Sequence, residues 1–293
     1  MKRTLKLGTR GSLLARAQSQ MVADQLSAAT GWPVALVILT TRGDLDQHRP
    51  LAALGGKGLF TFELEEGLRD GSLDLAVHSL KDLPTEDAEG LTLGAIPERE
   101  DPRDLIVGAP LSALPVGARL GTGSLRRRVQ ALALRPDLDV GDIRGNVETR
   151  LRKRDEGQFD ATILAAAGLN RLGMQRADGH AIPITEMVPA VGQGALAVQC
   201  RAGDPELLGL LAAIDHGPTR AAVAVERAFL QSFGGGCNTP AACHAWFEGG
   251  ALRALAVAPG PTGELRRVEG EGPDGPALGR RLAAALRAPE AGA

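Results

Sequence analysis

Residues 121–128 (GTGSLRRR) combine the residue types that bind anions. Two glycines and two hydroxyl residues follow a short strand-like run, and a helix-like segment then continues to Arg135. Ser124 is a good N-cap residue for that helix. Backbone N–H groups, hydroxyls and guanidinium groups at one helix N-terminus form an anion site, so this stretch predicts binding of carboxylate or phosphate groups.

The charge around this stretch supports the same interpretation. Residues 119–154 hold ten basic and four acidic side chains, whereas the whole chain has a formal net charge of −2. A second strand-like run, 138–143, leads into Arg144, and Arg150 follows one to two helical turns later. Ligands of open α/β sheets lie beyond the carboxyl ends of the strands. The alternative for these arginines is a solvated, Arg-rich helix face.

A second candidate site follows the strand-like run 73–77. Lys81 and Asp82 place a cation and a carboxylate on one loop after that strand, although a solvated charged turn is the commoner case for such a pair. His78, at the end of the apolar run, is interpreted as a structural histidine.

Cys237 is a candidate nucleophile. It follows three glycines at 234–236, which favour an accessible loop, and a nearby Arg-rich surface would lower the pKa of its thiol. Cys237, Cys243 and His244 would also suit a metal ion, but no fourth ligand lies nearby, and we expect no metal. Cys200 ends an apolar strand-like run and is expected in the core.

The elements that must position these residues alternate between strand and helix. Residues 4–7 and 34–39 predict two strands, and the helical spacing of apolar residues between them predicts a helix. The turn after the first strand then places Arg10 and Ser12 at the ligand edge of a parallel sheet. The polar, glycine-rich segment 41–58 is interpreted as a lid hinged on its glycines, with an ordinary surface loop as the alternative.

This alternation predicts an α/β protein with two lobes. We expect the first lobe at 1–98, with a return segment at 195–213, and the second at 99–194. A chain that crosses twice between two lobes forms a cleft, where ligands commonly bind. Residues 217–293 predict a small α+β domain, which carries Cys237.

Composition limits the classes of partner. Of the 33 basic residues among 293, only five are Lys, and Arg favours forked recognition of carboxylate or phosphate. The net charge of −2 and the aromatic content of 3% disfavour a structural or nucleic-acid-binding role. No apolar run approaches about 18 residues, and no secretory signal is evident. We therefore expect a cytoplasmic protein with a small, multiply anionic ligand and no membrane or nucleic-acid partner.

Taken in order, the motifs resemble those of the porphobilinogen deaminase family, also called hydroxymethylbilane synthase. The matching stretches cover almost the whole chain. They are GTRGS at 8–12, TRGD at 41–44, GGKGLF at 55–60, AVHSLKDLP at 76–84, EREDPRD at 98–104, GTGSLRR at 121–127, RGN at 144–146, VGQG at 191–194 and GGC at 235–237.

The resemblance implies three domains, of which two are like the lobes of type II periplasmic binding proteins around a central cleft. It also implies a dipyrromethane cofactor joined by a thioether to Cys237. Four porphobilinogen units are then added stepwise with loss of ammonia, and a linear tetrapyrrole of heme biosynthesis is released by hydrolysis. We expect a monomer.

The resemblance also implies residue roles. Asp82 matches the family's catalytic carboxylate, which would stabilise the azafulvene cation left by loss of ammonia, and Lys81 lies beside it. The implied cofactor contacts are Ser79, Lys81, Asp82, Thr122, Ser124, Arg126, Arg127, Arg144 and Gly145. The implied substrate contacts are Arg10, Ser12, Phe60, Arg144, Arg150 and Gln193, and Lys57 belongs to the lid.

Three positions depart from the family pattern. Gly123 stands where Ser is usual, Asn238 and Thr239 replace a usual Gln-Val pair, and Cys243 is not part of the pattern. A two-lobed anion sensor without catalysis would also explain the arginines, but it gives no reason for Cys237 or for the Lys81–Asp82 pair.

Overall fold

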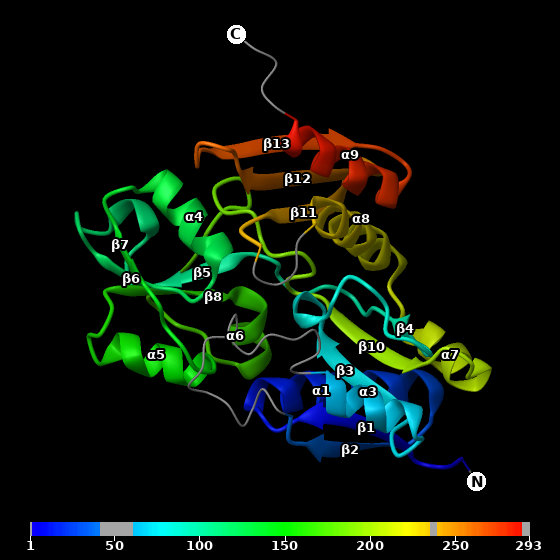
Figure 1. Cartoon of the computed structure of the whole chain (residues 1–293). Coiled ribbons are helices and arrows are strands. Elements are labelled where there is room, and N and C mark those ends of the chain that lie inside the picture. The colour runs from blue at the N-terminus through cyan, green and yellow to red at the C-terminus, as the bar shows by residue number, and fades with distance from the viewer. Residues whose placement is uncertain (1, 42–60, 235–238, 289–293) are drawn as a thin grey trace. The chain divides into compact units, whose positions relative to one another are not determined.

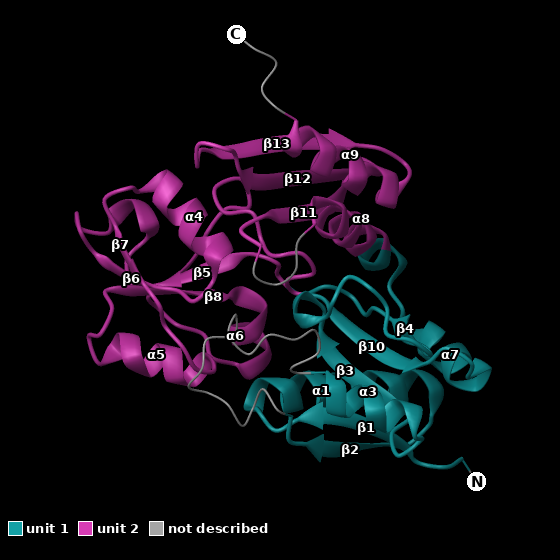
Figure 2. Cartoon of the chain, in the orientation of Figure 1, with its two compact units in different colours: residues 1–100, 195–220 teal, residues 101–194, 221–293 magenta. Residues whose placement is uncertain are grey.

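The computed structural model describes residues 2–41, 61–234 and 239–288. They form two compact units, one of residues 1–100 and 195–220 and the other of residues 101–194 and 221–293 (Figure 2). Among the described residues, no helix combines the length and the apolar composition that a membrane span requires.

The first unit is a five-stranded mixed sheet with helices (Figure 1). The strand order is β2-β1-β3-β10-β4, with β1 parallel to β2 and β3, and β10 antiparallel to β3 and β4. Its elements are β1 (Leu5–Arg10), α1 (Leu13–Thr30), β2 (Val34–Leu39), α3 (Phe62–Arg69), β3 (Leu75–Ser79), the 3-10 turn η1 (Leu80–Asp82), β4 (Leu91–Ala95), β10 (Leu196–Arg201), α7 (Pro205–Leu211) and η3 (Ala212–Ile214).

Local sequence signals determine where the helix of the first βαβ unit begins and ends. Ser12 has extended backbone angles and its side chain accepts a hydrogen bond from the backbone N–H of Ala15, which caps α1. Gly31 ends the helix with a φ of 67°, a conformation that glycine adopts readily. Leu5, Leu7 and Leu26 are fully buried in the core between sheet and helix.

The second unit contains a sheet of the same size, in the order β7-β6-β8-β5-β9. Strands β6, β7 and β8 are parallel, and β5 is antiparallel to β8 and β9. Its elements are β5 (Asp104–Val107), η2 (Leu111–Ala113), β6 (Arg119–Gly121), α4 (Leu125–Leu134), β7 (Asp139–Gly141), α5 (Val147–Asp155), β8 (Ala161–Ala165), α6 (Ala166–Leu172) and β9 (Gly179–Ala181).

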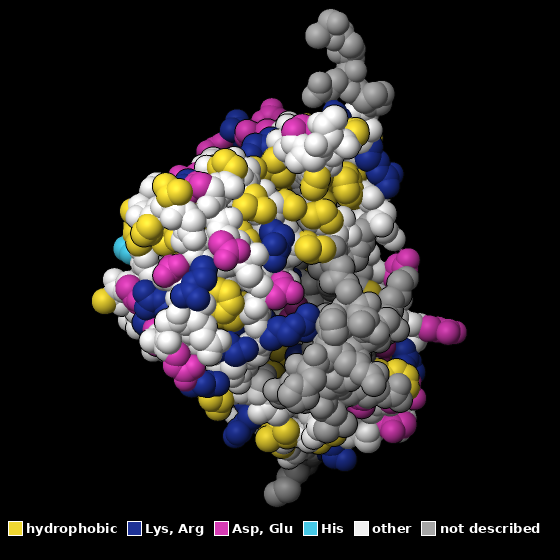
Figure 3. All heavy atoms as spheres, turned by 60° about the vertical axis from the view of Figure 1, so that its left-hand side comes forward, with side chains coloured by type: hydrophobic (Ala, Val, Ile, Leu, Met, Phe, Trp, Pro, Cys, Tyr) yellow, Lys and Arg dark blue, Asp and Glu magenta, His cyan; other side chains and the backbone are white. Residues whose placement is uncertain are grey.

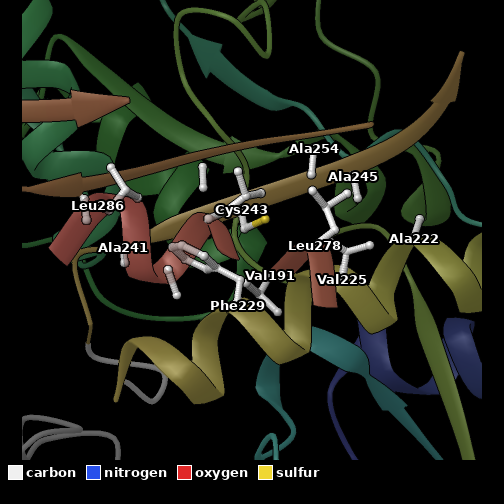
Figure 4. Packing of buried hydrophobic residues seen from close by; sticks show 14 of the residues in the cluster. Val191, Ala222, Val225, Phe229, Ala241, Cys243, Ala245, Ala254, Leu278 and Leu286 are labelled. Carbon is white, nitrogen blue, oxygen red and sulfur yellow. The ribbon is translucent and has the colours of Figure 1, made fainter. Parts of the chain in front are cut away.

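The C-terminal part of the chain forms a three-stranded antiparallel sheet with two helices. Its elements are α8 (Gly217–Phe233), β11 (Ala242–Glu248), β12 (Ala251–Pro259), β13 (Leu265–Glu271) and α9 (Gly275–Arg287). Phe229, Cys243 and Leu278 pack in its core (Figure 4). A Cβ at Gly279 would lie 2.2 Å from the carbonyl oxygen of Val225, so α8 and α9 approach closely there.

The α/β class is confirmed, and so is the position of most predicted elements. Two details differ from the sequence prediction. Strand β1 extends to Arg10, which was predicted in a turn, and the short strand β9 was not predicted. Cys200 and Cys243 are both fully buried, as expected for Cys200.

Candidate functional site

In the first unit, the polar residues predicted from the sequence lie after parallel strands. Arg10 ends β1, and Lys81 and Asp82 form the turn η1 directly after β3. Because β1 and β3 are parallel, with Gly8 opposite Ala76, both strands end at the same edge of the sheet. Arg10 and Lys81 are half-buried there, whereas Asp82 is exposed. This edge therefore presents two cations and a solvent-accessible carboxylate.

Ser79, the last residue of β3, is held by a side chain that the sequence did not single out. Gln18 lies on α1, is 5% exposed, and forms a hydrogen bond of 3.2 Å with the Ser79 hydroxyl. The helical position of Gln18, one and a half turns after the Ser12 cap, faces it towards the sheet. The only sequence feature that could have singled out Gln18 is its position as a polar residue on the apolar side of a helix.

His78 is buried, and its Nε2 lies 3.0 Å from Oε1 of Gln199 on β10. Burial lowers the pKa of His78 to about 4; the hydrogen bond with Gln199 opposes this shift, and the charge of Arg10 adds to it. The imidazole is therefore neutral near pH 7, and its Nε2 shares a hydrogen bond with the side-chain amide of Gln199. The interpretation of His78 as a structural histidine is confirmed.

In the second unit, the hydroxyl residues order the turn between β6 and α4. The Thr122 hydroxyl oxygen accepts a hydrogen bond of 3.2 Å from the backbone N–H of Ser124. The Ser124 side chain in turn caps α4 by accepting from the backbone N–H of Arg127 at 3.4 Å. Thr122 is 1% exposed and Ser124 is half-buried. The predicted N-cap at Ser124 is confirmed.

Arg126 and Arg127, in the first turn of α4, both pair with Asp104. Nη1 of Arg126 lies 2.6 Å from one oxygen of the Asp104 carboxylate, and Nη2 of Arg127 lies 2.8 Å from the other. Nε2 of Gln193 donates to the same carboxylate at 2.9 Å. All four side chains are buried. Three side chains that the resemblance assigns to ligand binding thus converge on one acidic residue.

The sequence did not reveal this role of Asp104. It ends the densely charged motif at 98–104. In the structure it is the first residue of β5 and is fully buried. The sequence signal for its burial was the apolar run 105–107. Such a run predicts a buried strand, and the residue that begins the strand can be buried with it.

Arg144, Gly145 and Arg150 lie after β7. Gly145 has a φ of 115°, and its carbonyl oxygen accepts a hydrogen bond of 2.8 Å from Nε of Arg150. Lys153 donates to the carbonyl oxygen of Arg144 at 3.2 Å, and Asn146 caps α5 through the backbone N–H of Thr149. This loop is thus tied to its helix by side chains along α5.

Ion pairs neutralise part of the positive charge of this unit. Arg135 pairs with Asp137 at 2.7 Å, and Arg154 pairs with Asp178 at 2.7 Å. Figure 3 shows Lys and Arg side chains mixed with Asp and Glu on the face that it displays. Some of the arginines that give residues 119–154 their excess of positive charge, such as Arg135 and Arg154, therefore form ion pairs within the protein.

Three predicted site residues, Lys57, Phe60 and Cys237, lie outside the described residues. The cysteines that the structure describes, Cys200 and Cys243, are both buried, and burial raises the pKa of Cys200 to about 11. Across residues 2–41, 61–234 and 239–288, His, Cys, Asp and Glu side chains form no cluster of three or more that would hold a metal ion.

Two family models match the chain. Residues 5–209 match the model described as porphobilinogen deaminase, dipyromethane cofactor binding domain, and residues 220–288 match porphobilinogen deaminase, C-terminal domain.

Curated relatives called porphobilinogen deaminase are similar over most of their length. The protein of Roseiflexus sp. (strain RS-1) is 54% identical over 86% of this chain and 84% of its own. That of Desulforudis audaxviator is 50% identical over 98% of this chain and 95% of its own. Among solved structures, the methionine binding protein MetQ is 12% identical, with a TM-score of 0.46 over 74% of this chain and 92% of its own.

Proposed function

The chain belongs to the porphobilinogen deaminase family, and from this premise we propose how its own residues perform the reaction. Four porphobilinogen molecules are condensed head to tail with loss of ammonia, and the linear product, hydroxymethylbilane, is released by hydrolysis. The observation that carries this assignment is the placement of Arg10, Lys81 and Asp82 after parallel strands at one edge of a sheet.

The described residues fit the family's dipyrromethane cofactor by the chemistry of their donors. Pyrrole units of this pathway carry two carboxylates each, and the chain offers guanidinium and hydroxyl groups at strand ends in both units. Nε of Arg126 is buried and has no hydrogen-bond partner among the described residues, so one N–H is left for a ligand. When bound, the cofactor supplies the primer to which pyrrole units are added.

We propose that the second unit binds carboxylates of the cofactor and of the growing chain. Thr122 and Ser124 order the turn, Arg126 and Arg127 present their remaining donors there, and Arg144 and Arg150 follow the neighbouring strand. A hydrogen bond to a charged group contributes about 1.5–3 kcal/mol, whereas an exposed ion pair contributes about 0–1 kcal/mol. Burial of Arg126 and Arg127 therefore favours them over the arginines of α5, which are more exposed.

In the first unit, we propose that Asp82 acts on the reacting substrate. Loss of ammonia from the aminomethyl group of porphobilinogen leaves an electron-poor carbon, and a fixed carboxylate beside it would stabilise the positive charge and transfer protons. Arg10, Ser12 and Lys81 would bind the substrate carboxylates, and Ser79 would contact the cofactor from the end of β3. Its bond to Gln18 holds the Ser79 hydroxyl in place.

We propose Cys237 as the residue that carries the cofactor. The chain has three cysteines, and the other two are fully buried. A buried thiol with a raised pKa, such as that of Cys200, is a poor nucleophile and a poor attachment point. The glycines before Cys237 in the sequence favour an accessible loop.

The domain limits proposed are 1–98 with 195–213, then 99–194, then 217–293. The boundary between the two matching family models, at residues 209–220, supports the last of them, as does the core of the C-terminal sheet, whose buried residues other than Val191 all lie within 217–293. A monomeric state and a cytoplasmic location remain predictions, which sedimentation of the purified chain and fractionation of cells would check.

The experiment that tests this function is a turnover assay. Purified protein incubated with porphobilinogen should release four ammonia molecules for each linear tetrapyrrole formed. Binding of porphobilinogen without release of ammonia would instead indicate the anion sensor considered above.

A further inference from the structure

We propose that Asp104 is a positioning residue for Arg126 and Arg127, which it holds in one orientation for an anionic ligand. The inference rests on the proposed role of these two arginines as carboxylate ligands. It concerns a residue to which the resemblance assigns no ligand contact.

The geometry of the carboxylate supports this role. One oxygen, Oδ1, accepts from Nε and Nη2 of Arg127 at 3.0 and 2.8 Å and from Nη2 of Arg126 at 3.2 Å. The other, Oδ2, accepts from Nη1 of Arg126 at 2.6 Å. Such two-point pairing fixes the plane of a guanidinium group as well as its distance.

A second anchor holds each guanidinium group from another direction. Nη1 of Arg126 donates to the carbonyl oxygen of Val188 at 2.8 Å, and Nη1 of Arg127 donates to that of Ile163 at 2.8 Å. Ile163 belongs to β8, which pairs with β5 so that Asp104 lies opposite Ala165. The arginines are therefore fixed to the sheet itself, and neither can change rotamer without breaking several bonds.

The carboxylate is itself oriented. Nε2 of Gln193 donates to Oδ1 of Asp104 at 2.9 Å and to the carbonyl oxygen of Pro102 at 2.7 Å. Glycines with positive φ, Gly192 at 72° and Gly194 at 86°, flank Gln193, and the Glu226 carboxylate accepts the backbone N–H of Gly192 at 2.7 Å. Gln193 therefore orients the Asp104 carboxylate, which in turn holds the arginines. We infer that Gln193 influences ligand binding mainly by this route.

The charge balance of the cluster is also set by Asp104. Burial alone would raise the pKa of its carboxyl group, but the charges of Arg126 and Arg127 outweigh that effect and hold the pKa well below its usual range. Asp104 is therefore ionised, and the buried cluster keeps one net positive charge. That charge lies at the N-terminus of α4, where the helix dipole also favours an anion.

The test compares two variants of Asp104 with one matched control. Asp104→Asn keeps the shape and removes the charge, and Asp104→Glu keeps the charge and moves it by one methylene. Asp74→Asn is the control, because Asp74 is also buried, accepts from Arg3 and the backbone N–H of Lys6 at 2.8 Å each, and belongs to the first unit. The readouts are melting temperature, KM for porphobilinogen, kcat, and the fraction of purified chain that carries a cofactor adduct by intact mass.

We expect both Asp104 variants to raise KM and to lower the adduct-bearing fraction. The loss in kcat/KM should be on the order of 10- to 100-fold, since a displacement of about 1 Å in a positioning group costs up to about 100-fold. Asp74→Asn should lower the melting temperature without changing KM or the adduct fraction. If Asp104→Asn does not fold, Asp104→Glu, which leaves no arginine without its counter-charge, decides the question.

Two results separate failure of this inference from failure of the proposed site. If Arg127→Gln raises KM but Asp104→Glu has the KM and adduct fraction of the unaltered chain, Asp104 does not position the arginines. If Arg127→Gln itself leaves KM and adduct fraction unchanged, the assignment of these arginines as carboxylate ligands is wrong.

Discussion

Nε of Arg150 donates a hydrogen bond of 2.8 Å to the carbonyl oxygen of Gly145, which lies just before the helix that carries Arg150. The bond fixes the carbonyl of a residue whose φ of 115° places it outside the usual range of L-residues. A Cβ at Gly145 would lie 2.5 Å from Cγ2 of Thr149. The loop that presents Arg144 therefore depends on glycine at this position.

The first prediction concerns this loop. Gly145→Ala should destabilise the chain by about 1–3 kcal/mol, because it combines an unfavourable φ with a clash. It should also raise KM for porphobilinogen, since Arg144 would be displaced. Melting temperature and steady-state kinetics measure both effects.

Gly157→Ala is the matched control for that change. Gly157 lies after the other end of α5 and has a φ of 77°, and a Cβ added there would meet no atom within 4 Å. This variant should lose stability from its backbone angle alone and keep its KM. Equal KM values for the two variants would refute the proposed dependence of Arg144 on the Gly145 loop.

The second prediction concerns catalysis by Asp82. Asp82→Asn should fold normally, because the side chain is exposed, and its kcat should fall by about 100-fold or more, the usual contribution of a positioned acid or base. Glu89→Gln, an exposed carboxylate on the turn before β4, should leave kcat unchanged. Unchanged turnover in Asp82→Asn would remove this residue from the mechanism.

The third prediction concerns the pH dependence of stability. His78 is neutral in the folded chain, with a pKa lowered from 6.5 to about 4, so the unfolded chain binds the extra proton between these values. The free energy of unfolding should therefore fall as the pH drops from about 6.5 to about 4, by about 3 kcal/mol in total at about 1.4 kcal/mol per pH unit. Urea titrations across this range measure the slope.

His78→Gln removes the titrating group and should remove its share of that slope. The buried aspartates titrate in the folded chain below their ordinary pKa of 3.8, so they change the slope mainly at lower pH. Identical slopes for the two proteins between about pH 6.5 and pH 4.5 would show that His78 does not titrate as its burial requires.

Much of this fold could be predicted because its elements have strong local signals. Ser124 was predicted as a cap from residue type and position, and it caps α4 in the structure. The mostly buried strands β3, β8 and β10 correspond to apolar runs, and so does the partly exposed strand β2. The strand β9 was missed because it has only three residues, all at least partly exposed, and its pairing with β5 is not encoded in an apolar pattern.

The partners of the arginines could not be predicted in the same way. Arg126 lies 22 residues from Asp104, and their pairing depends on β5 entering the sheet antiparallel beside β8. A count of charges treats Asp104 as part of an exposed run and Arg126 as part of an exposed cluster. Only the tertiary structure shows that Arg126 and Asp104 are both buried and form an ion pair, and that Gln193 donates a hydrogen bond to the same carboxylate.

The measurement that tests the central claim most directly is the intact mass of active protein, alone and as Cys237→Ser. We predict that the active chain carries the mass of two pyrrole rings, that digestion places this mass on Cys237, and that Cys237→Ser has its bare sequence mass and no turnover. Active protein with the bare sequence mass, or an adduct that persists in Cys237→Ser, would contradict it.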